Sequence, residues 1–97
     1  MNITGVKIRA IRDDTRPLKA VVSVTIDDEL VLHDMKIIEE YGKRFLSMPR
    51  KTDPLGKYRN LYHPITREGR RQLEQAVFEA YEKQLNDMGD YDNGSEN

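Results

Sequence analysis

The sequence contains no cysteine, and it has no long uninterrupted run of apolar residues. Without cysteine, the chain can form neither disulfide bonds nor a cysteine-ligated metal site. Its longest nearly continuous apolar stretch, residues 18–26, is far too short to span a bilayer. The first residues also lack the basic segment and apolar run of a signal peptide. We therefore expect a soluble, cytoplasmic protein with no membrane partner.

The sequence also lacks the short motifs that carry common catalytic chemistry. It has no HExxH zinc motif, no glycine-rich phosphate loop and no GxSxG nucleophile motif. Its two histidines are His33, which precedes Asp34, and His63. On a regular strand, His33 and Asp34 would point to opposite faces and could not share a site. We therefore expect structural histidines in a protein that is not an enzyme and takes no metal, cofactor or small-molecule substrate.

The length of 97 residues fits a single domain. Residues 87–97 contain four acidic residues, no basic residue and few apolar ones. Such a segment cannot bury enough surface to offset the entropy lost on ordering. We therefore expect residues 1–86 to form the domain and residues 87–97 to be a disordered acidic tail. Because so small a domain buries a modest share of its surface, we also expect a stabilising homodimer.

Alternating side-chain character predicts strands in the first two thirds of the chain. In the second strand, the apolar residues on one face are Ala20, Val22, Val24 and Ile26. In the third strand, the same period places together Val31, His33, Met35 and Ile37. Turn residues delimit strands at residues 6–10, 18–26, 30–38 and 44–48 and a short fifth strand at 58–62. We expect residues 50–57, which include Asp53-Pro54 and Gly56, to form a loop.

The pattern of residues in the last third of the chain predicts one helix. Thr66 is a suitable N-cap residue, because its side-chain oxygen can accept a free amide of the first turn. Apolar residues then recur at helical spacing, namely Leu73, Ala76, Val77, Ala80, Tyr81 and Leu85. The helix should end near residues 86–88, with Gly89 just beyond. The predicted fold is therefore α+β, with a small antiparallel sheet of four to five strands followed by a C-terminal amphipathic helix on one face.

Positive charge is concentrated in one part of the chain. Residues 43–71 contain nine basic and two acidic residues, a net charge of +7, whereas the whole chain has a net charge of −1. The basic residues are Lys43, Arg44, Arg50, Lys51, Lys57, Arg59, Arg67, Arg70 and Arg71. A surface of that sign attracts polyanions, above all the phosphates of nucleic acids. Arg50 and Lys51 lie on the expected loop, with Lys57 and Arg59 on its far side, although each could instead be an ordinary solvated surface residue.

Three arginines, Arg67, Arg70 and Arg71, occupy the first turns of the predicted helix, where positive charge opposes the helix dipole. Residues three and four apart lie on one helix face, so these side chains and the free amides could together receive an anion. The alternative is that Arg70 and Arg71 pair with Glu74 and Gln75, in the less favourable order along the helix.

The aromatic residues have several alternative roles. Tyr58 and Tyr62 alternate with basic residues and could stack on nucleic-acid bases. We expect Phe45 and Tyr81 to be packing residues. Phe78 lies off the apolar stripe of the helix, so a monomer would expose it, and it is our candidate for the dimer interface.

Several short segments resemble the SpoVG (stage V sporulation protein G, septation regulator) family of bacteria. The segments that carry this resemblance are Lys19-Ala20, Ser23-Val24-Thr25-Ile26-Asp27, Val31-Leu32-His33-Asp34, Phe45-Leu46-Ser47-Met48-Pro49, His63-Pro64-Ile65 and Gln75-Ala76-Val77 with Tyr81. The resemblance covers residues 6–81. It implies a small dimeric nucleic-acid-binding regulator with an antiparallel sheet and a C-terminal helical part. It also implies binding residues at Arg50, Lys51, Arg70 and Arg71.

Our leading hypothesis is a non-enzymatic regulator of bacterial gene expression, septation or sporulation. It would bind either DNA alone or both DNA and RNA. The contacts would be made to phosphates by the basic loop and the helix N-terminus. The alternative is a protein-interaction module whose basic patch binds an acidic partner protein. Both hypotheses predict salt-sensitive association, but only nucleic-acid binding should persist with purified protein and DNA alone.

Overall fold

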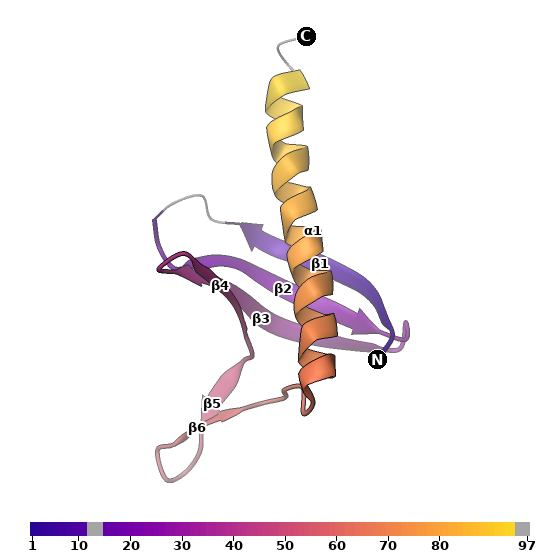
Figure 1. The fold of residues 1–97 in the computed structure, drawn as a ribbon. Helices are drawn as coiled ribbons and strands as arrows, with labels where there is room; N and C mark the ends of the chain where they lie inside the picture. Colours follow the sequence, from indigo (N-terminus) through magenta and orange to yellow (C-terminus); the bar gives the residue numbers. More distant parts are fainter. Residues whose placement is uncertain (12–14, 95–97) are drawn as a thin grey trace.

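The structure is a computed structural model of the 97-residue chain. It describes the backbone of residues 1–11 and 15–94, and the side chains in these ranges up to residue 87. Four strands form an antiparallel sheet in the order β1-β2-β3-β4, namely β1 (Ile3–Ile11), β2 (Leu18–Ile26), β3 (Leu30–Glu40) and β4 (Lys43–Ser47). One helix, α1 (Arg67–Gly94), crosses a single face of this sheet (Figure 1). The predicted α+β fold is confirmed.

The core lies between α1 and the face of the sheet that it covers. Val22, Val24, Met35 and Ile37 are fully buried from the sheet side, together with Val77 from the helix. The predicted apolar stripe of the helix is confirmed, since Leu73, Val77 and Tyr81 are buried and its other members are partly buried. Among the aromatic predictions, Tyr81 packs in this core, but Phe45 does not. Phe45 remains 43% exposed, because its position in β4 alternates with that of the buried Leu46 and faces away from the helix.

A β-bulge in β3 changes which residues face the core. Val22 pairs with Met35 and Val24 pairs with Leu32, so Ser23 alone lies opposite both His33 and Asp34. Asp34 has a positive φ of 73°, which marks the irregular position. The prediction that Val31 and His33 share a face with Met35 and Ile37 was therefore wrong. Leu32 packs against the core instead, while Val31 and His33 are exposed.

The segment predicted as a loop contains a strand. β5 (Arg50–Thr52) pairs antiparallel with β6 (Tyr58–Asn60) in a separate two-stranded sheet. We call residues 50–60 the arm, because Figure 1 shows this hairpin extending away from the sheet and helix. The fifth strand was thus predicted in nearly the right place, but it pairs with the missed β5 rather than with the main sheet. All six strand residues of the arm are exposed.

The helix is longer than predicted. It runs to Gly94, beyond the end expected near residues 86–88, so Gly89 lies inside it. No proline interrupts this part of the sequence, and a single glycine costs a helix only about 1 kcal/mol relative to alanine. Residues 95–97 of the predicted acidic tail lie outside the described residues, and the disorder of that tail stays a prediction. Within residues 1–11 and 15–94, no helix is long and apolar enough to cross a membrane.

Candidate nucleic-acid interface

The seven predicted binding residues fall into two groups. Arg50, Lys51, Lys57 and Arg59 lie on the arm, and Arg67, Arg70 and Arg71 lie on the first turns of α1, which we call the helix start. Both groups lie toward the same end of the molecule in Figure 1, opposite the C-terminal end of α1. Only the linker of residues 61–66 separates them, and six residues span at most about 20 Å. The linker therefore keeps the base of the arm within about 20 Å of the helix start.

One acidic residue organises the tip of the arm. The Asp53 carboxylate accepts hydrogen bonds from the backbone amides of Leu55 and Lys57, both at 2.9 Å, and from Arg59 Nε at 3.0 Å. The backbone hydrogen bond from Lys57 and the side-chain hydrogen bond from Arg59 lower the pKa of the Asp53 carboxyl below its ordinary value. Gly56 closes the turn at a positive φ of 84°, which glycine adopts without steric cost. Asp53 therefore acts as a local organiser, and the sequence analysis missed this role.

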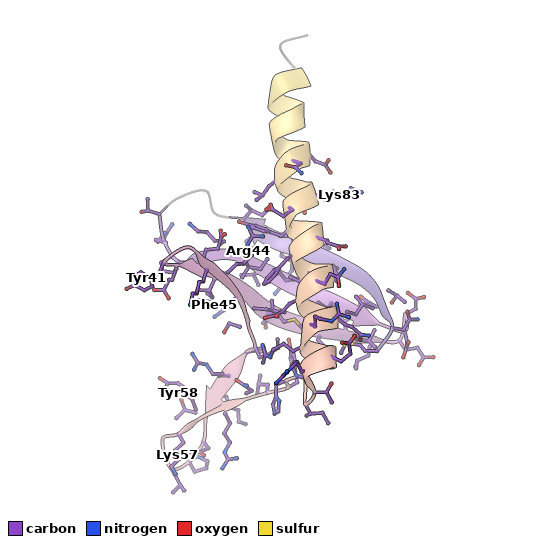
Figure 2. All side chains as sticks on the ribbon, viewed as in Figure 1. Tyr41, Arg44, Phe45, Lys57, Tyr58 and Lys83 are labelled. Carbon is purple, nitrogen blue, oxygen red and sulfur yellow. The ribbon has the colours of Figure 1, made fainter. Side chains whose placement is uncertain are left out.

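The remaining cations of the arm have few partners. The Arg50 guanidinium lies 5.3 Å from the centroid of the Tyr58 ring, a cation–π contact on one face of the hairpin. Lys51 pairs directly with Arg59 across the strands, where like charges destabilise a hairpin. Among the described residues, the side chains of Lys51 and Lys57 form no ion pair or hydrogen bond. Figure 2 shows Lys57 and Tyr58 on the arm, away from the main sheet and the helix.

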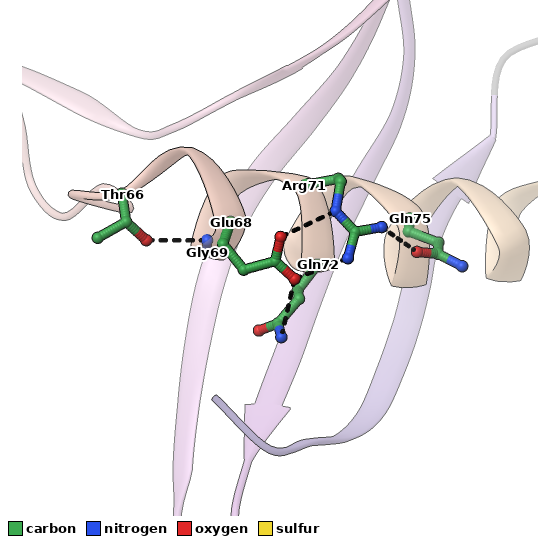
Figure 3. A network of polar contacts seen from close by, with 6 residues as sticks. All are labelled: Thr66, Glu68, Gly69, Arg71, Gln72 and Gln75. Carbon is green, nitrogen blue, oxygen red and sulfur yellow. Dashed lines mark hydrogen bonds and ion pairs between the residues drawn. The ribbon is translucent and has the colours of Figure 1, made fainter.

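The helix start is organised by a cap and a polar network, shown in Figure 3. The predicted N-cap is confirmed, because Thr66 Oγ1 accepts the backbone amide of Gly69 at 2.9 Å. Glu68 supplies the negative charge that the helix dipole favours in the first turn. Arg71 donates to both Glu68 oxygens, at 2.6 and 3.0 Å, and to Gln75 Oε1 at 3.3 Å. The hydrogen bond from Arg71 lowers the pKa of Glu68, and the same bond raises the pKa of Arg71.

The three arginines of the helix start are therefore not equivalent. Arg71 is held by the network, and Arg70 Nη1 lies 3.8 Å from Glu74 Oε2. The alternative pairing of Arg70 with Glu74 and of Arg71 with Gln75 is thus present in the structure. Arg67 is exposed and forms no ion pair with any described residue. The charge most available to an external anion at the helix start is that of Arg67.

Arg44 belongs to the same basic stretch of sequence but has a different environment. Its guanidinium pairs with Glu39 Oε2 at 3.1 Å and with Glu82 Oε1 at 3.2 Å. It also lies 5.6 Å from the ring centroid of Phe78 and 5.0 Å from that of Tyr81. Burial alone would lower the pKa of Arg44, but the hydrogen bonds to Glu82 and Glu39 raise it. Arg44 therefore joins β4 to α1, as its position between them in Figure 2 shows.

Phe78, the candidate for a dimer interface, is less exposed than expected. It is partly buried, packs against the core and lies close to Arg44. Phe78 lines a shallow surface hollow on α1, together with Glu82 and Lys83. A role in dimerisation stays a prediction.

Tyr62 and His33 form hydrogen bonds that link parts of the fold, and a structural role for the exposed His63 stays a prediction. Tyr62 is partly buried, and its hydroxyl donates to the backbone carbonyl oxygen of His33 at 2.5 Å. Burial, followed by the charge of Asp34, raises the pKa of Tyr62. His33 Nδ1 lies 2.9 Å from Ser23 Oγ, and Asp34 pairs with Arg9. Within the described residues, no three acidic or histidine side chains gather in a way that could hold a metal ion.

Comparison of this sequence with known proteins identifies its family. The model of the SpoVG family matches residues 1–83. The chain belongs to the SpoVG family. A relative from Lachnospira eligens is 47% identical over 83 residues, which cover 86% of this chain and 93% of the relative. Relatives from Caldanaerobacter subterraneus subsp. tengcongensis and Clostridium novyi are 45% and 40% identical, over 86% and 99% of this chain and 90% and 95% of their own lengths.

The names of these three relatives assign them to SpoVG and to septation. The resemblance inferred from the short segments of sequence is therefore confirmed. SpoVG proteins are septation proteins rather than enzymes, and this agrees with the expectation drawn from the missing catalytic motifs.

Proposed function

We propose that this SpoVG protein is a nucleic-acid-binding regulator of septation, sporulation or gene expression. It contacts phosphates through the arm and the helix start and needs no catalytic residue. The observation that carries this proposal is a set of exposed cations that have no acidic partner among the described residues: Lys51 and Lys57 on the arm, and Arg67 at the helix start toward the same end of the molecule (Figure 1). Lys51, which has no ion pair among the described residues, lies directly across the hairpin from Arg59, and like charges in that position lower the stability of a hairpin. Phosphates would supply the missing counter-charge.

Electrostatics also favours a polyanion over a single anion. The exposed cations extend from the tip of the arm to the first turns of α1, whereas a small anion needs a compact cluster. Each phosphate contact releases counterions from the nucleic acid, so affinity should fall steeply as salt rises. An acidic partner protein would also bind in a salt-sensitive way, but it would have to be added to the assay.

The test is a mobility-shift assay with purified protein and random-sequence duplex DNA at two salt concentrations. Replacing Arg70 and Arg71 together by alanine should weaken binding across all sequences and flatten the salt dependence. The effect of Arg71 should be the smaller of the two, because its charge is already offset by Glu68. A double variant that keeps full affinity and the circular dichroism spectrum of the parent would show that Arg70 and Arg71 are not part of the interface.

We propose further that the protein acts as a homodimer. A two-fold dimer would present two arms and two helix starts to one duplex. Phe78, which lines the hollow with Glu82 and Lys83, is the candidate contact. Sedimentation equilibrium should show a dimer at micromolar concentration, and a monomer throughout that range would count against this part of the proposal.

A further inference from the structure

The two faces of the arm carry different kinds of side chain. Because side chains alternate along a strand, the register of β5 and β6 sorts the arm residues by face. One face holds the cross-strand pair of Lys51 and Arg59. The other face holds the pairs Arg50 with Asn60 and Thr52 with Tyr58. The first face thus carries two cations, of which Arg59 is ion-paired with Asp53, whereas the second combines one positive charge with an amide and two hydroxyls.

The second face matches the chemistry of base edges in duplex DNA. Arginine can donate two hydrogen bonds to O6 and N7 of guanine. Asparagine can form two hydrogen bonds with adenine, accepting one from N6 and donating one to N7. Threonine can donate to or accept from either kind of base edge. Arg50, Asn60 and Thr52 lie side by side on this face, and no acidic side chain shares it.

Contacts within the arm also pre-organise it for binding to base edges. The Arg50 guanidinium lies 5.3 Å from the centroid of the Tyr58 ring, which limits the conformations open to it before binding. A side chain held in this way loses less conformational entropy when it binds. At the tip, the hydrogen bonds of Asp53 to Leu55 and Lys57 fix the turn that joins the two strands.

The dimensions and position of the arm suit the major groove of duplex DNA. The major groove of B-form DNA is about 12 Å wide and admits a two-stranded β-ribbon. The arm is such a ribbon, and all six of its strand residues are exposed. It extends away from the four-stranded sheet and α1, which together we call the body (Figure 1). The deep, narrow major groove of an RNA helix would exclude it. Stacking of unpaired bases is less suited to this surface, because Arg50 already covers one face of the Tyr58 ring.

We propose that the arm enters the major groove of duplex DNA and reads base edges with Arg50 and Asn60. The Lys51 and Arg59 face then points out of the groove, and the long stems of these side chains let their charges reach the flanking phosphates. Lys57 at the tip reaches phosphates further along the duplex. This inference rests on the proposed function and adds to it the groove, the duplex and the residues that select sequence.

The experiment begins with selection of bound sequences from random duplex DNA by the purified full-length protein. The parent protein should enrich a preferred sequence. Arg50→Lys keeps the positive charge but loses the bidentate hydrogen bonding to guanine. It should therefore reduce discrimination between bases at one position by about 5- to 150-fold. Asn60→Ala should reduce discrimination between bases at a second position of the selected sequence.

The matched control is Lys51→Ala on the opposite face of the arm, which should weaken binding to all sequences evenly and leave the preferred sequence unchanged. A second measurement uses the selected duplex with 7-deazaguanine and 7-deazaadenine in place of the purines. This change removes the N7 acceptors from the major groove, so the parent protein should bind the modified duplex more weakly. A ligand that fills the minor groove should not compete.

The outcomes separate this inference from the function on which it rests. An unchanged sequence preference in both Arg50→Lys and Asn60→Ala would overturn base reading by the arm, as would a parent protein that selects no sequence. Equal binding of the 7-deaza duplex, or tighter binding of single-stranded DNA or RNA than of duplex, would overturn the major-groove mode while leaving nucleic-acid binding intact. Absence of binding to any of these probes would overturn both proposals.

Discussion

The body of the molecule and its arm use arginine in opposite ways. In the body, Arg44 lies between two glutamates and two aromatic rings, and its charge holds β4 against α1. On the arm, Arg50 has one aromatic neighbour and no acid, and the nearby Lys51 has no ionic partner among the described residues. The sequence places all three residues in one basic stretch. Charge density along a sequence therefore locates a candidate surface, but the partners of each cation decide which charges are available for binding.

The largest expected effect separates the stability of the body from that of the arm. Met35 is fully buried beneath α1, so Met35→Ala should lower the free energy of unfolding by about 2–5 kcal/mol. Tyr58 is 72% exposed on the arm, so Tyr58→Ala should change it by less than about 0.5 kcal/mol. Urea denaturation followed by circular dichroism measures both. Comparable losses in the two variants would show that the arm is part of the folding unit, against the distinction drawn here.

A second prediction concerns Arg44 itself. Arg44→Ala removes two partly exposed ion pairs and two cation–π contacts, which should cost about 1–2 kcal/mol of stability. Affinity for DNA should stay within about twofold of the parent, because this charge is already neutralised. The matched control is Lys43→Ala, which removes the same charge one residue earlier and should leave stability unchanged. A loss of DNA affinity in Arg44→Ala beyond that in Lys43→Ala would place Arg44 in the interface.

The smallest expected effect lies at the tip of the arm. The amides of Leu55 and Lys57 and the Arg59 side chain lower the pKa of Asp53, so this carboxylate stabilises the turn above its unfolded pKa. That stabilisation should be lost as the pH falls through the lowered pKa of the folded state. A carboxyl titration by NMR should therefore give Asp53 a midpoint below the ordinary aspartate pKa of 3.8.

In Asp53→Asn, the amide signals of Leu55 and Lys57 should become insensitive to this pH range, and the denaturation midpoint of the body should not move. A midpoint of Asp53 at or above 3.8 would show that the turn is not held in this way.

Much of the fold follows from local sequence. Alternation in residues 18–26 and the helical spacing from Leu73 to Leu85 predict the two surfaces that form the core, because each pattern matches the period of its element. The N-cap at Thr66 was predictable for the same reason, since a hydroxyl before a helix satisfies a free amide.

The wrong predictions share one physical cause. In each case the structure depends on pairing or packing with residues far away in the sequence. The bulge opposite Ser23 depends on the register between β2 and β3, and no turn residue marks it in the sequence. Likewise, β5 is only three polar residues long and becomes a strand because β6 pairs with it. The exposure of Phe45 follows from which sheet face α1 covers.

The candidate site was predictable in part for a related reason. The cluster of cations could be read from the sequence, but the partners that distinguish its members could not. Glu68 and Glu74 are near neighbours on the helix and could be anticipated as partners, whereas the pairing of Arg44 with Glu82 spans 38 positions. The roles of Asp53 and Tyr62 also depend on how the hairpin and the linker fold back.

The central claim is that the unpaired cations of the arm bind phosphate and contribute nothing to the fold. The most direct test compares Lys51→Ala/Lys57→Ala with Lys7→Ala/Lys36→Ala, which removes the same charge from exposed positions on the sheet face that α1 does not cover. DNA affinity is measured across a salt series, with thermal unfolding as the check on the fold. The arm variant should reduce the slope of log affinity against log salt by about 2, and the control should leave it unchanged, with equal unfolding midpoints. Equal slopes in the two variants, or a loss confined to the control, would contradict the account.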